Sequence, residues 1–409
     1  MSVDSIRNRI IRFAVPVIFF LLPWQTRWIF ARHQVVGHDF EYGIISLYAV
    51  EVLIALVLIV YWRLQIKKEY EKQIGFVFLF LIFVFITAVF AFDKQLAFGQ
   101  VLHVFFALVL FLLLLDQRTC LKNVSIAFFL GLLAPILLGF WQVVAGFSWS
   151  STIFGLAQRD AQILGDAVLT LANGTRILRA YGSFGHPNIF GGYLVICVLS
   201  LFAFFKNRYV IILPIISIIF TFSQSAWLAL IISLVCAFIV YKYFNKLKKD
   251  FFWIAGVFSA VILIGSVFGV IAINNFGFDQ SSISERVEQY SQWPLIASES
   301  LAIGSGVGNY IYAIENLNPD LQWWEFQPVH NVPMLIVGEI GFAGLILLIL
   351  WFYEVDKINY SRLPKKGALI AMSMCCALLV ISGLDHYLWT QWSGLALCAY
   401  VMAITVRID

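Results

Sequence analysis

Charged residues are scarce in this sequence. Asp, Glu, Lys and Arg together make up 12% of the 409 residues, whereas apolar residues make up 61% and the mean hydropathy is +0.89. Soluble globular domains carry about 25% charged residues, so this composition excludes that class. We therefore predict a polytopic membrane protein.

The sequence also lacks the cysteine pattern of a disulfide-bonded or metal-binding protein. Of the six cysteines, five fall within apolar runs and Cys120 is expected in a cytoplasmic loop, which leaves the outer segments without a disulfide-forming pair. No Cys and His cluster has metal-ligand spacing, so we expect neither a metal nor another cofactor. The net charge of +4 comes mainly from inner loops that suit anionic membrane lipids. Nothing in the sequence suggests a nucleic-acid partner.

Long apolar runs are abundant. Crossing a bilayer takes about 17 to 25 apolar residues, and unbroken runs favour helices over a barrel. The predicted fold is all-α, with about twelve transmembrane helices. The candidate spans begin near Ile10, Ile44, Ile74, Leu96, Val124, Ile189, Tyr209, Ala226, Phe251, Val332, Ala368 and Gln391.

The distribution of basic residues predicts the orientation. Arg7, Arg9 and Arg12 precede the first run, and no small-residue cleavage site follows before Pro23, so we expect a retained anchor. With the N-terminus inside, 20 of the 27 Lys and Arg residues fall in cytoplasmic segments and 7 in outer segments. This matches the positive-inside rule, and both termini are predicted to be cytoplasmic.

The chain is expected to form a single transmembrane domain, residues 1–409, with two long outer segments, 147–186 and 274–329. Long connections in compact proteins are often functional. In the second segment, Ser282 and Glu285 have the spacing of a capping box, which predicts a short surface helix. Trp293 in this helix suits either a membrane interface or stacking on a sugar ring.

Two of the predicted spans begin with similar motifs. Pro187-Asn188 starts one, because proline suits the first helical turn and asparagine can cap it. Asn331 and Pro333 repeat this arrangement at a later span. Helix N-termini attract anions, and Arg179, nine residues before Asn188, can fold back over the first of them.

His330, next to the second of these helix starts, is the main candidate for catalysis. Its unperturbed pKa near 6.5 allows it to take a proton from a hydroxyl group near neutral pH. Glu339 would lie deeper and point the opposite way, so we expect it to bond a neighbouring helix or hold the outer loop rather than form a dyad. His186 and His386 are supporting candidates, and His386 fits either a cavity wall or a plain loop.

Arginines supply the positive charge of the outer segments. Arg286, together with Arg179 and Arg176, would suit a diphosphate, because guanidinium groups bind phosphate oxygens in pairs and stay charged. The alternative for Arg286 is a local ion pair with neighbouring glutamates. Gly304 to Asn309 lacks the dinucleotide fingerprint and is predicted to be a turn.

Five stretches, in this order, resemble the O-antigen ligase and O-antigen polymerase superfamily of bacterial membrane glycosyltransferases. They are Arg179 to Asn188, Thr221 to Ala226, Arg286 to Trp293, Gly304 to Asn309, and His330-Asn331 with Glu339-x-Gly341-x-x-Gly344. The resemblance implies a GT-C-like helical bundle with a large outer loop between helices 9 and 10. It also implies a polysaccharide-forming enzyme of the cell envelope, such as one of lipopolysaccharide biosynthesis.

The same resemblance implies a reaction. A glycan would move from a polyprenyl (undecaprenyl) diphosphate carrier to a lipid, glycan or protein acceptor, without a metal, on the outer face of the inner (cytoplasmic) membrane. Arg179 and Arg286 would grip the diphosphate, and His330 would activate the acceptor. Gln224 stands where the family commonly has arginine. Since an amide cannot neutralise phosphate, Arg176 or another cation would have to substitute, or the donor would differ.

Alternatives remain at this point. Ligation, repeat-unit polymerisation and transfer to a protein hydroxyl share the donor site and differ in the acceptor. A transporter of lipids or glycans, without covalent chemistry, is the rival from another class. Such a protein places ionisable groups near the bilayer midplane, and Glu51 in the second predicted span fits that alternative.

Overall fold

The computed structural model describes residues 3–60, 64–171, 173–205, 208–247, 280–363 and 365–408. These residues are mostly helical, and among them seven helices are long and apolar enough to cross a membrane. These are α3 (Glu71–Val89), α4 (Lys94–Leu115), α5 (Leu121–Ala145), α6 (Pro187–Phe204), α8 (Gln224–Leu247), α12 (Val332–Ser361) and α13 (Lys366–Leu384). The prediction of a polytopic membrane protein is confirmed.

The predicted number of spans is not reached among the described residues. Four other apolar helical stretches are shorter, with 10 to 17 residues. They belong to α1 (Val3–Leu21), α2 (Ala49–Val60), α15 (Trp392–Arg407), and α7 (Ile212–Thr221) with the turn η2 (Arg208–Ile211) before it. The run expected near Phe251 lies outside the described residues. Length and composition therefore identify seven candidate spans in the described part of the chain.

A β-hairpin replaces the beginning of the second predicted run. Strands β1 (Arg27–Val35) and β2 (His38–Tyr48) pair antiparallel, and the burial of β1 alternates from residue to residue as in a half-buried strand. Val36 and Gly37 connect them with φ angles of 49° and 76°, the positive values of a tight hairpin turn. The expectation of a span from Ile44 is thus wrong at its start, because helix α2 begins at Ala49.

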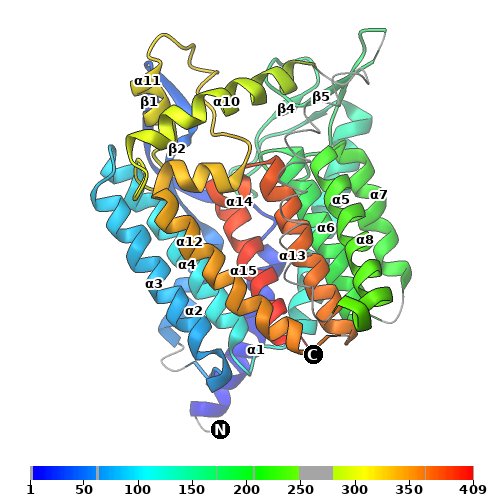
Figure 1. Cartoon of the computed structure of the whole chain (residues 1–409). Helices are drawn as coiled ribbons and strands as arrows, with labels where there is room; N and C mark the ends of the chain where they lie inside the picture. Colours follow the sequence, from blue (N-terminus) through cyan, green and yellow to red (C-terminus); the bar gives the residue numbers. More distant parts are fainter. Residues whose placement is uncertain are drawn as a thin grey trace.

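The two long segments predicted to lie on the outer side contain short elements. In 147–186, β3 (Phe147–Ser148) pairs with β4 (Arg159–Asp160), and β5 (Val168–Thr170) pairs with β6 (Arg176–Leu178). In Figure 1 these strands lie at the same end of the molecule as the β-hairpin, whereas both chain termini lie at the opposite end. We call these the distal end and the terminal end.

Helices α10 (Gln280–Glu299) and α11 (Tyr310–Leu317) lie in the second of these segments, and α10 runs across the top of the bundle in Figure 1. The predicted surface helix therefore exists. Its start is different, since Ser282 already lies inside the helix, and the capping-box prediction is wrong.

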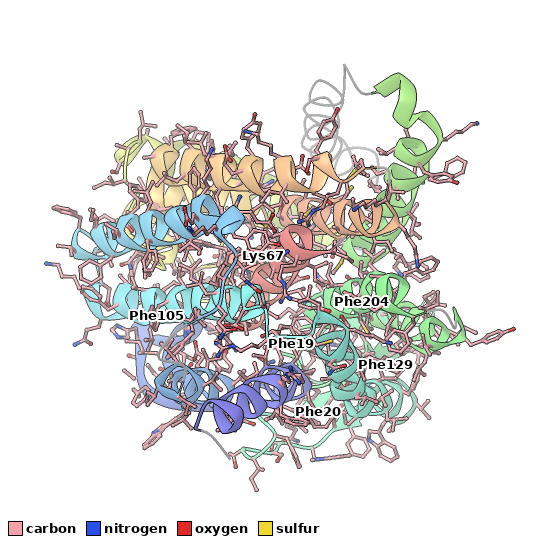
Figure 2. All side chains as sticks on the ribbon, turned by 90° about the horizontal axis from the view of Figure 1, so that it is seen from below. Phe19, Phe20, Lys67, Phe105, Phe129 and Phe204 are labelled. Carbon is pink, nitrogen blue, oxygen red and sulfur yellow. The ribbon has the colours of Figure 1, made fainter. Side chains whose placement is uncertain are left out.

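Helix α15 lies in the interior, where it packs against α4, α6, α12 and α13. Its Tyr400 hydroxyl group lies 2.7 Å from the Ser125 hydroxyl of α5 and 2.6 Å from the Ser200 hydroxyl of α6. Viewed from the terminal end, Phe19 of α1 lies within the bundle (Figure 2), and its ring centroid is 4.8 Å from that of Tyr400. The helices from both ends of the sequence thus share one core.

Helix α12 is interrupted at Gly341, which has φ 71° and ψ 178°. A side-chain carbon at this position would lie 2.1 Å from the Ala302 carbonyl oxygen. The missing side chain of Gly341 therefore lets the loop that contains Ala302 pack directly against α12. The loop is the predicted turn: its Gly308 N–H donates to Glu339 Oε2 at 2.8 Å, and Trp389 Nε1 donates to the same oxygen at 2.7 Å. Glu339 therefore holds the outer loop and a neighbouring helix.

Candidate functional site

Three segments meet at the distal end: the start of α6, the start of α12, and the connection from α13 to α14 (Tyr387–Thr390). They contribute His186, His330 and the pair Asp385-His386, which we call the histidine cluster. The ring centroids of His330 and His386 are 4.9 Å apart. Asp385 and His386 are only 5% and 6% exposed, so their polar groups need protein partners.

Asp385 is the negative centre of the histidine cluster. Its Oδ2 accepts a hydrogen bond from Asn188 Nδ2 at 2.8 Å, and its Oδ1 accepts from the backbone N–H of His386 at 2.8 Å. Burial alone would raise the pKa of Asp385, but the positive charge of the neighbouring imidazoles in their protonated form and the Asn188 amide outweigh it and lower that pKa to about 2. The carboxylate is therefore ionised.

Arg179 reaches Asp385 through Asn188. Its Nη2 donates to Asn188 Oδ1 at 2.8 Å, and its Nε donates to the Thr221 carbonyl oxygen at 2.9 Å. The guanidinium thus folds back over the start of α6 as the sequence suggests. Burial lowers the pKa of Arg179, but an arginine remains charged at any working pH.

His186, rather than Asn188, caps helix α6. Its Nδ1 accepts a hydrogen bond from the Asn188 backbone N–H at 3.2 Å, so the prediction of Asn188 as the cap is wrong. Because Nδ1 accepts, the neutral ring carries its proton on Nε2. Burial, and then the charge of Arg179, lower the pKa of His186 to about 3, and the ring is neutral at pH 7.

His330 has the opposite tautomer. Oε1 of Gln289 lies 3.2 Å from the backbone nitrogen of His330 and 2.9 Å from its Nδ1. Since the backbone N–H can only donate, this oxygen is an acceptor, and Nδ1 must also donate its proton to it. Burial, and then His386, lower the pKa of His330, so the ring is neutral and Nε2 keeps its lone pair.

Asn331, the next residue, caps α12 as predicted. Its side-chain oxygen accepts from the Met334 backbone N–H at 3.0 Å, and Pro333 lies in the first turn. The cap leaves the ring of His330 outside the helix and available to the cluster.

His386 joins the cluster to the β-hairpin. Its Nδ1 lies 2.9 Å from Thr390 Oγ1, and its Nε2 lies 3.3 Å from the Tyr42 hydroxyl oxygen. Burial lowers the pKa of His386 and raises that of Tyr42 well above its usual value, so both groups are neutral at pH 7. Tyr42 thus brings strand β2 into the site.

Helix α10 covers the cluster. It carries Gln289 and, one turn earlier, the half-buried Arg286, whose charge lowers the pKa of both His330 and His386. Trp293 Nε1 donates to the Met334 carbonyl oxygen at 2.7 Å and ties α10 to the first turn of α12. This tie, rather than a free interfacial or sugar-stacking ring, is the role that the contacts of Trp293 support.

Two other predicted site residues lie to the side of the cluster. Arg176 is on β6, where its Nη2 donates to the Ile163 carbonyl oxygen at 3.2 Å. Gln224 is exposed at the start of α8, three residues after Thr221, which bonds Arg179. Gln224 thus lies close, in the chain, to the carbonyl group that Arg179 binds.

Sequence reasoning missed several contributors to the site. Asp385 was within reach of prediction, because two consecutive ionisable residues between apolar spans are the same kind of signal that singled out His330. Nothing in the sequence marks Tyr42 or Gln289 as a site residue, because both are neutral. Their positions in the site depend on how the hairpin and α10 pack against the helix bundle. Arg159, whose Nη2 donates to the Gly185 carbonyl oxygen at 2.9 Å beside His186, is a further cation near the site.

A small enclosed cavity of about 50 Å³ adjoins the cluster. Tyr42 and Thr390, which both contact His386, line it together with Glu339, Arg27 and His103. A polar void of this size accommodates water.

Comparison with known proteins gives one family match. Residues 209–349 match the model of a family described as O-antigen ligase. This range contains Gln224, Arg286, His330 and Glu339, whereas Arg179 and Asp385 lie on either side of it. None of the curated proteins compared with the chain matches it.

Proposed function

On the premise that the chain carries an O-antigen ligase family domain over residues 209–349, we propose that it is an O-antigen ligase-like glycosyltransferase. The family implies a glycan ligase or polymerase that uses lipid-linked glycans. In this proposal the donor is a glycan on a polyprenyl diphosphate, such as undecaprenyl diphosphate, and the acceptor is a hydroxyl group.

The observation that carries the proposal is the hydrogen bonding of His330. His330 donates its Nδ1 proton to the Gln289 side-chain oxygen. Its Nε2 therefore carries a lone pair, which lies next to the cationic groups of the distal end. Such a nitrogen can accept the proton of an acceptor hydroxyl group as its oxygen attacks the anomeric carbon. His330 is the proposed general base.

The arginines are the proposed diphosphate site. Arg179 is fixed by Asn188 and Thr221 through Nη2 and Nε. It would bind the diphosphate of the donor together with Arg286 of α10. Gln224 and Arg176 are further candidates for phosphate contacts at the rim of this site. Cations placed in advance stabilise the charge that develops on a leaving group.

The steps balance without a further reactant. The bond between the anomeric carbon and the diphosphate oxygen breaks, the electron pair leaves with the carrier diphosphate, and the acceptor oxygen forms the new glycosidic bond. The acceptor proton passes to His330 Nε2. Attack from the face opposite the diphosphate inverts the anomeric configuration, and no metal is needed in this sequence of steps.

Donor binding would also strengthen the base. Burial and nearby positive charge lower the pKa of His330 in the free protein. A diphosphate beside Arg179 and Arg286 would offset that positive charge and raise the pKa of His330 again. Proton acceptance would then be favoured when the donor is in place.

The proposal includes the wider architecture. We place the described helices in a twelve-span, GT-C-like bundle with residues 147–186 and 274–329 on the outer side, both termini in the cytoplasm and the site at the outer face of the inner membrane. Ligation, repeat-unit polymerisation and protein O-glycosylation would share this donor site. His186, Asn188, Asn331, Glu339 and His386 have supporting roles in it.

The transporter alternative rests on Glu51, and its contacts do not favour it. Glu51 is fully buried, its Oε1 lies 2.6 Å from His103 Nδ1, and its Oε2 accepts from the Tyr48 backbone N–H at 2.8 Å. A carboxylate with partners at both oxygens is suited to joining α2, α4 and the hairpin.

The decisive experiment follows glycan transfer by the purified full-length protein, supplied with a polyprenyl diphosphate glycan and an acceptor extract. We expect a new conjugate by mass spectrometry, retained activity in the presence of a strong chelator, and loss of the conjugate with His330→Ala at unchanged donor binding. A strain lacking the protein should accumulate the carrier-linked glycan. A normal conjugate profile in that strain, together with undiminished turnover by His330→Ala, would refute the proposal.

A further inference from the structure

A second cationic region lies at the terminal end of the bundle, away from the histidine cluster. It is a pocket of about 740 Å³. Five basic side chains line it, and none of the described residues that line it carries a carboxylate. They are Arg12, Arg118, Lys122, Lys366 and Arg407.

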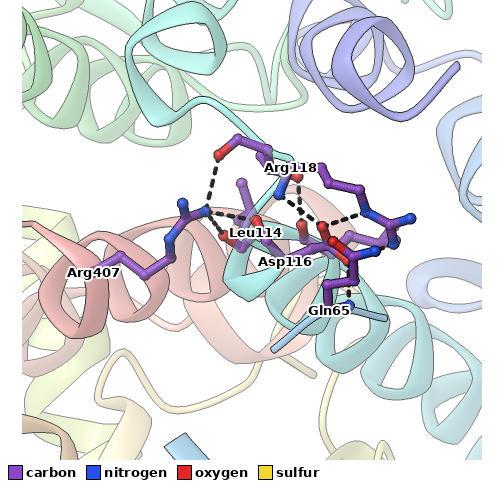
Figure 3. Close-up of polar contacts among 7 residues, drawn as sticks. Gln65, Leu114, Asp116, Arg118 and Arg407 are labelled. Carbon is purple, nitrogen blue, oxygen red and sulfur yellow. Dashed lines mark hydrogen bonds and ion pairs between the residues drawn. The ribbon is translucent and has the colours of Figure 1, made fainter. Parts of the chain in front are cut away.

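Backbone and side-chain contacts fix two of these cations in place (Figure 3). Arg407 Nη1 lies 3.0 Å from the carbonyl oxygens of both Asp116 and Thr119. Arg118 forms a two-pronged ion pair with Asp116, at 2.8 Å from Nε to Oδ1 and 2.7 Å from Nη2 to Oδ2. Asp116 is fully buried and offsets the charge of Arg118.

Two helices begin at this pocket. Leu121, Lys122 and Asn123, the first turn of α5, line it, as do Lys366 and Gly367, the first residues of α13. The residues before them form no side-chain cap hydrogen bond. The partial positive charge of both helix starts therefore adds to that of the basic side chains.

The position of the pocket along the spanning helices is the one expected for lipid headgroups. Spanning helices α4, α5, α6 and α13 all begin or end around it, and Phe204 at the end of α6 contributes an apolar wall (Figure 2). A phosphate group with an apolar tail beside it matches these surroundings. Arginine and lysine bind phosphate oxygens by charge-assisted hydrogen bonds.

We propose that this pocket binds the phosphate of an anionic phospholipid headgroup. The exposed Lys122 and Arg12 would close on the phosphate, while Arg407 and Arg118 form the fixed floor. The site is independent of the proposed glycan transfer, since it lies at the opposite end of the bundle.

Native mass spectrometry of the delipidated full-length protein in detergent tests this proposal. Phosphatidylglycerol is titrated against phosphatidylcholine with the same acyl chains, and inorganic phosphate is a third arm. We expect one phosphatidylglycerol to bind at least about tenfold more tightly than phosphatidylcholine. The double variant Arg12→Gln, Lys122→Gln should weaken that binding by about tenfold to thirtyfold.

The matched control is Lys68→Gln, Lys72→Gln, which removes two exposed lysines near the start of α3 that do not line the pocket. This control should change phosphatidylglycerol binding less than twofold. Equal binding of the two lipids, or equal losses in the two double variants, would overturn the proposal. Binding of inorganic phosphate that depends on Arg12 and Lys122, without preference for phosphatidylglycerol, would show that the ligand is a soluble anion instead. The single variant Lys122→Gln gives the same test if the double variant does not fold.

Discussion

Helices α6 and α12 both begin with a histidine, a proline and an asparagine, yet the two histidines are used differently. At α6 the histidine is itself the cap, because His186 Nδ1 accepts from the Asn188 N–H. At α12 the cap is Asn331, and His330 lies one position before it. The histidine at α6 occupies the cap position, whereas the histidine at α12 lies one residue before it. His186 therefore has a structural role, and His330 keeps a free lone pair on Nε2.

The partner atoms explain the difference. The Asn188 side chain is engaged at both ends, by Arg179 at its oxygen and by Asp385 at its nitrogen. It therefore cannot cap α6, and His186 does so. Asn331 has no such competing charged partners, and its oxygen is free to accept the Met334 N–H. In the proposed function, the start of α6 therefore serves donor binding, and the start of α12 serves proton transfer.

Replacing each histidine by asparagine tests this comparison most severely. Because asparagine is a good cap, His186→Asn should keep α6 intact and reduce the transfer rate by no more than about threefold. His330→Asn removes the proposed base and should lower kcat by about 10²-fold to 10⁴-fold. Steady-state transfer assays on both variants, with equal thermal unfolding midpoints as the folding control, measure the contrast. Equal losses of activity would mean that the two histidines are not functionally distinct.

Arg179 tests the binding role of the α6 start. Arg179→Ala should raise the KM for the lipid-linked donor with a smaller change in kcat, and reduce kcat/KM by about tenfold to 100-fold, because charge-assisted hydrogen bonds to phosphate are lost. Arg179→Lys should restore little, since an ammonium group cannot bond Asn188 and Thr221 as the guanidinium does. Arg32→Ala on the hairpin, an exposed cation paired with Asp39, is the control. An unchanged KM in Arg179→Ala would contradict the assignment.

Much of this arrangement is local and could be predicted. Apolar run lengths predict most of the long helices, and Asn331 with Pro333 predicts the start of α12, because capping depends on neighbouring residues. The α6 cap could not be predicted in the same way. His186 and Asn188 both suit it, and the choice depends on Arg179 and on Asp385, which is 197 residues away from Asn188.

The β-hairpin shows a second limit. The apolar residues continue without a break from β2 into α2, so the run near Ile44 suggests one span. The strand and the helix have similar compositions and differ only in the periodicity of their apolar residues. As a consequence Tyr42 could not be placed near His386. The histidine cluster needs tertiary contacts between distant segments, and only its separate pieces are visible in the sequence.

The smallest effect concerns stability and pH. His186 is neutral in the folded protein, with a pKa lowered to about 3, but has a pKa near 6.5 when unfolded. Between these values the unfolded chain binds more protons, so keeping this histidine neutral lowers the stability of the fold progressively as the pH falls below 6.5. From pH 7.5 to 5.5 the loss is at most about 1.4 kcal/mol. Thermal unfolding in detergent should show this decrease in the wild type and a shallower one in His186→Asn, and identical slopes would mean that His186 is not held neutral by its place at the α6 start.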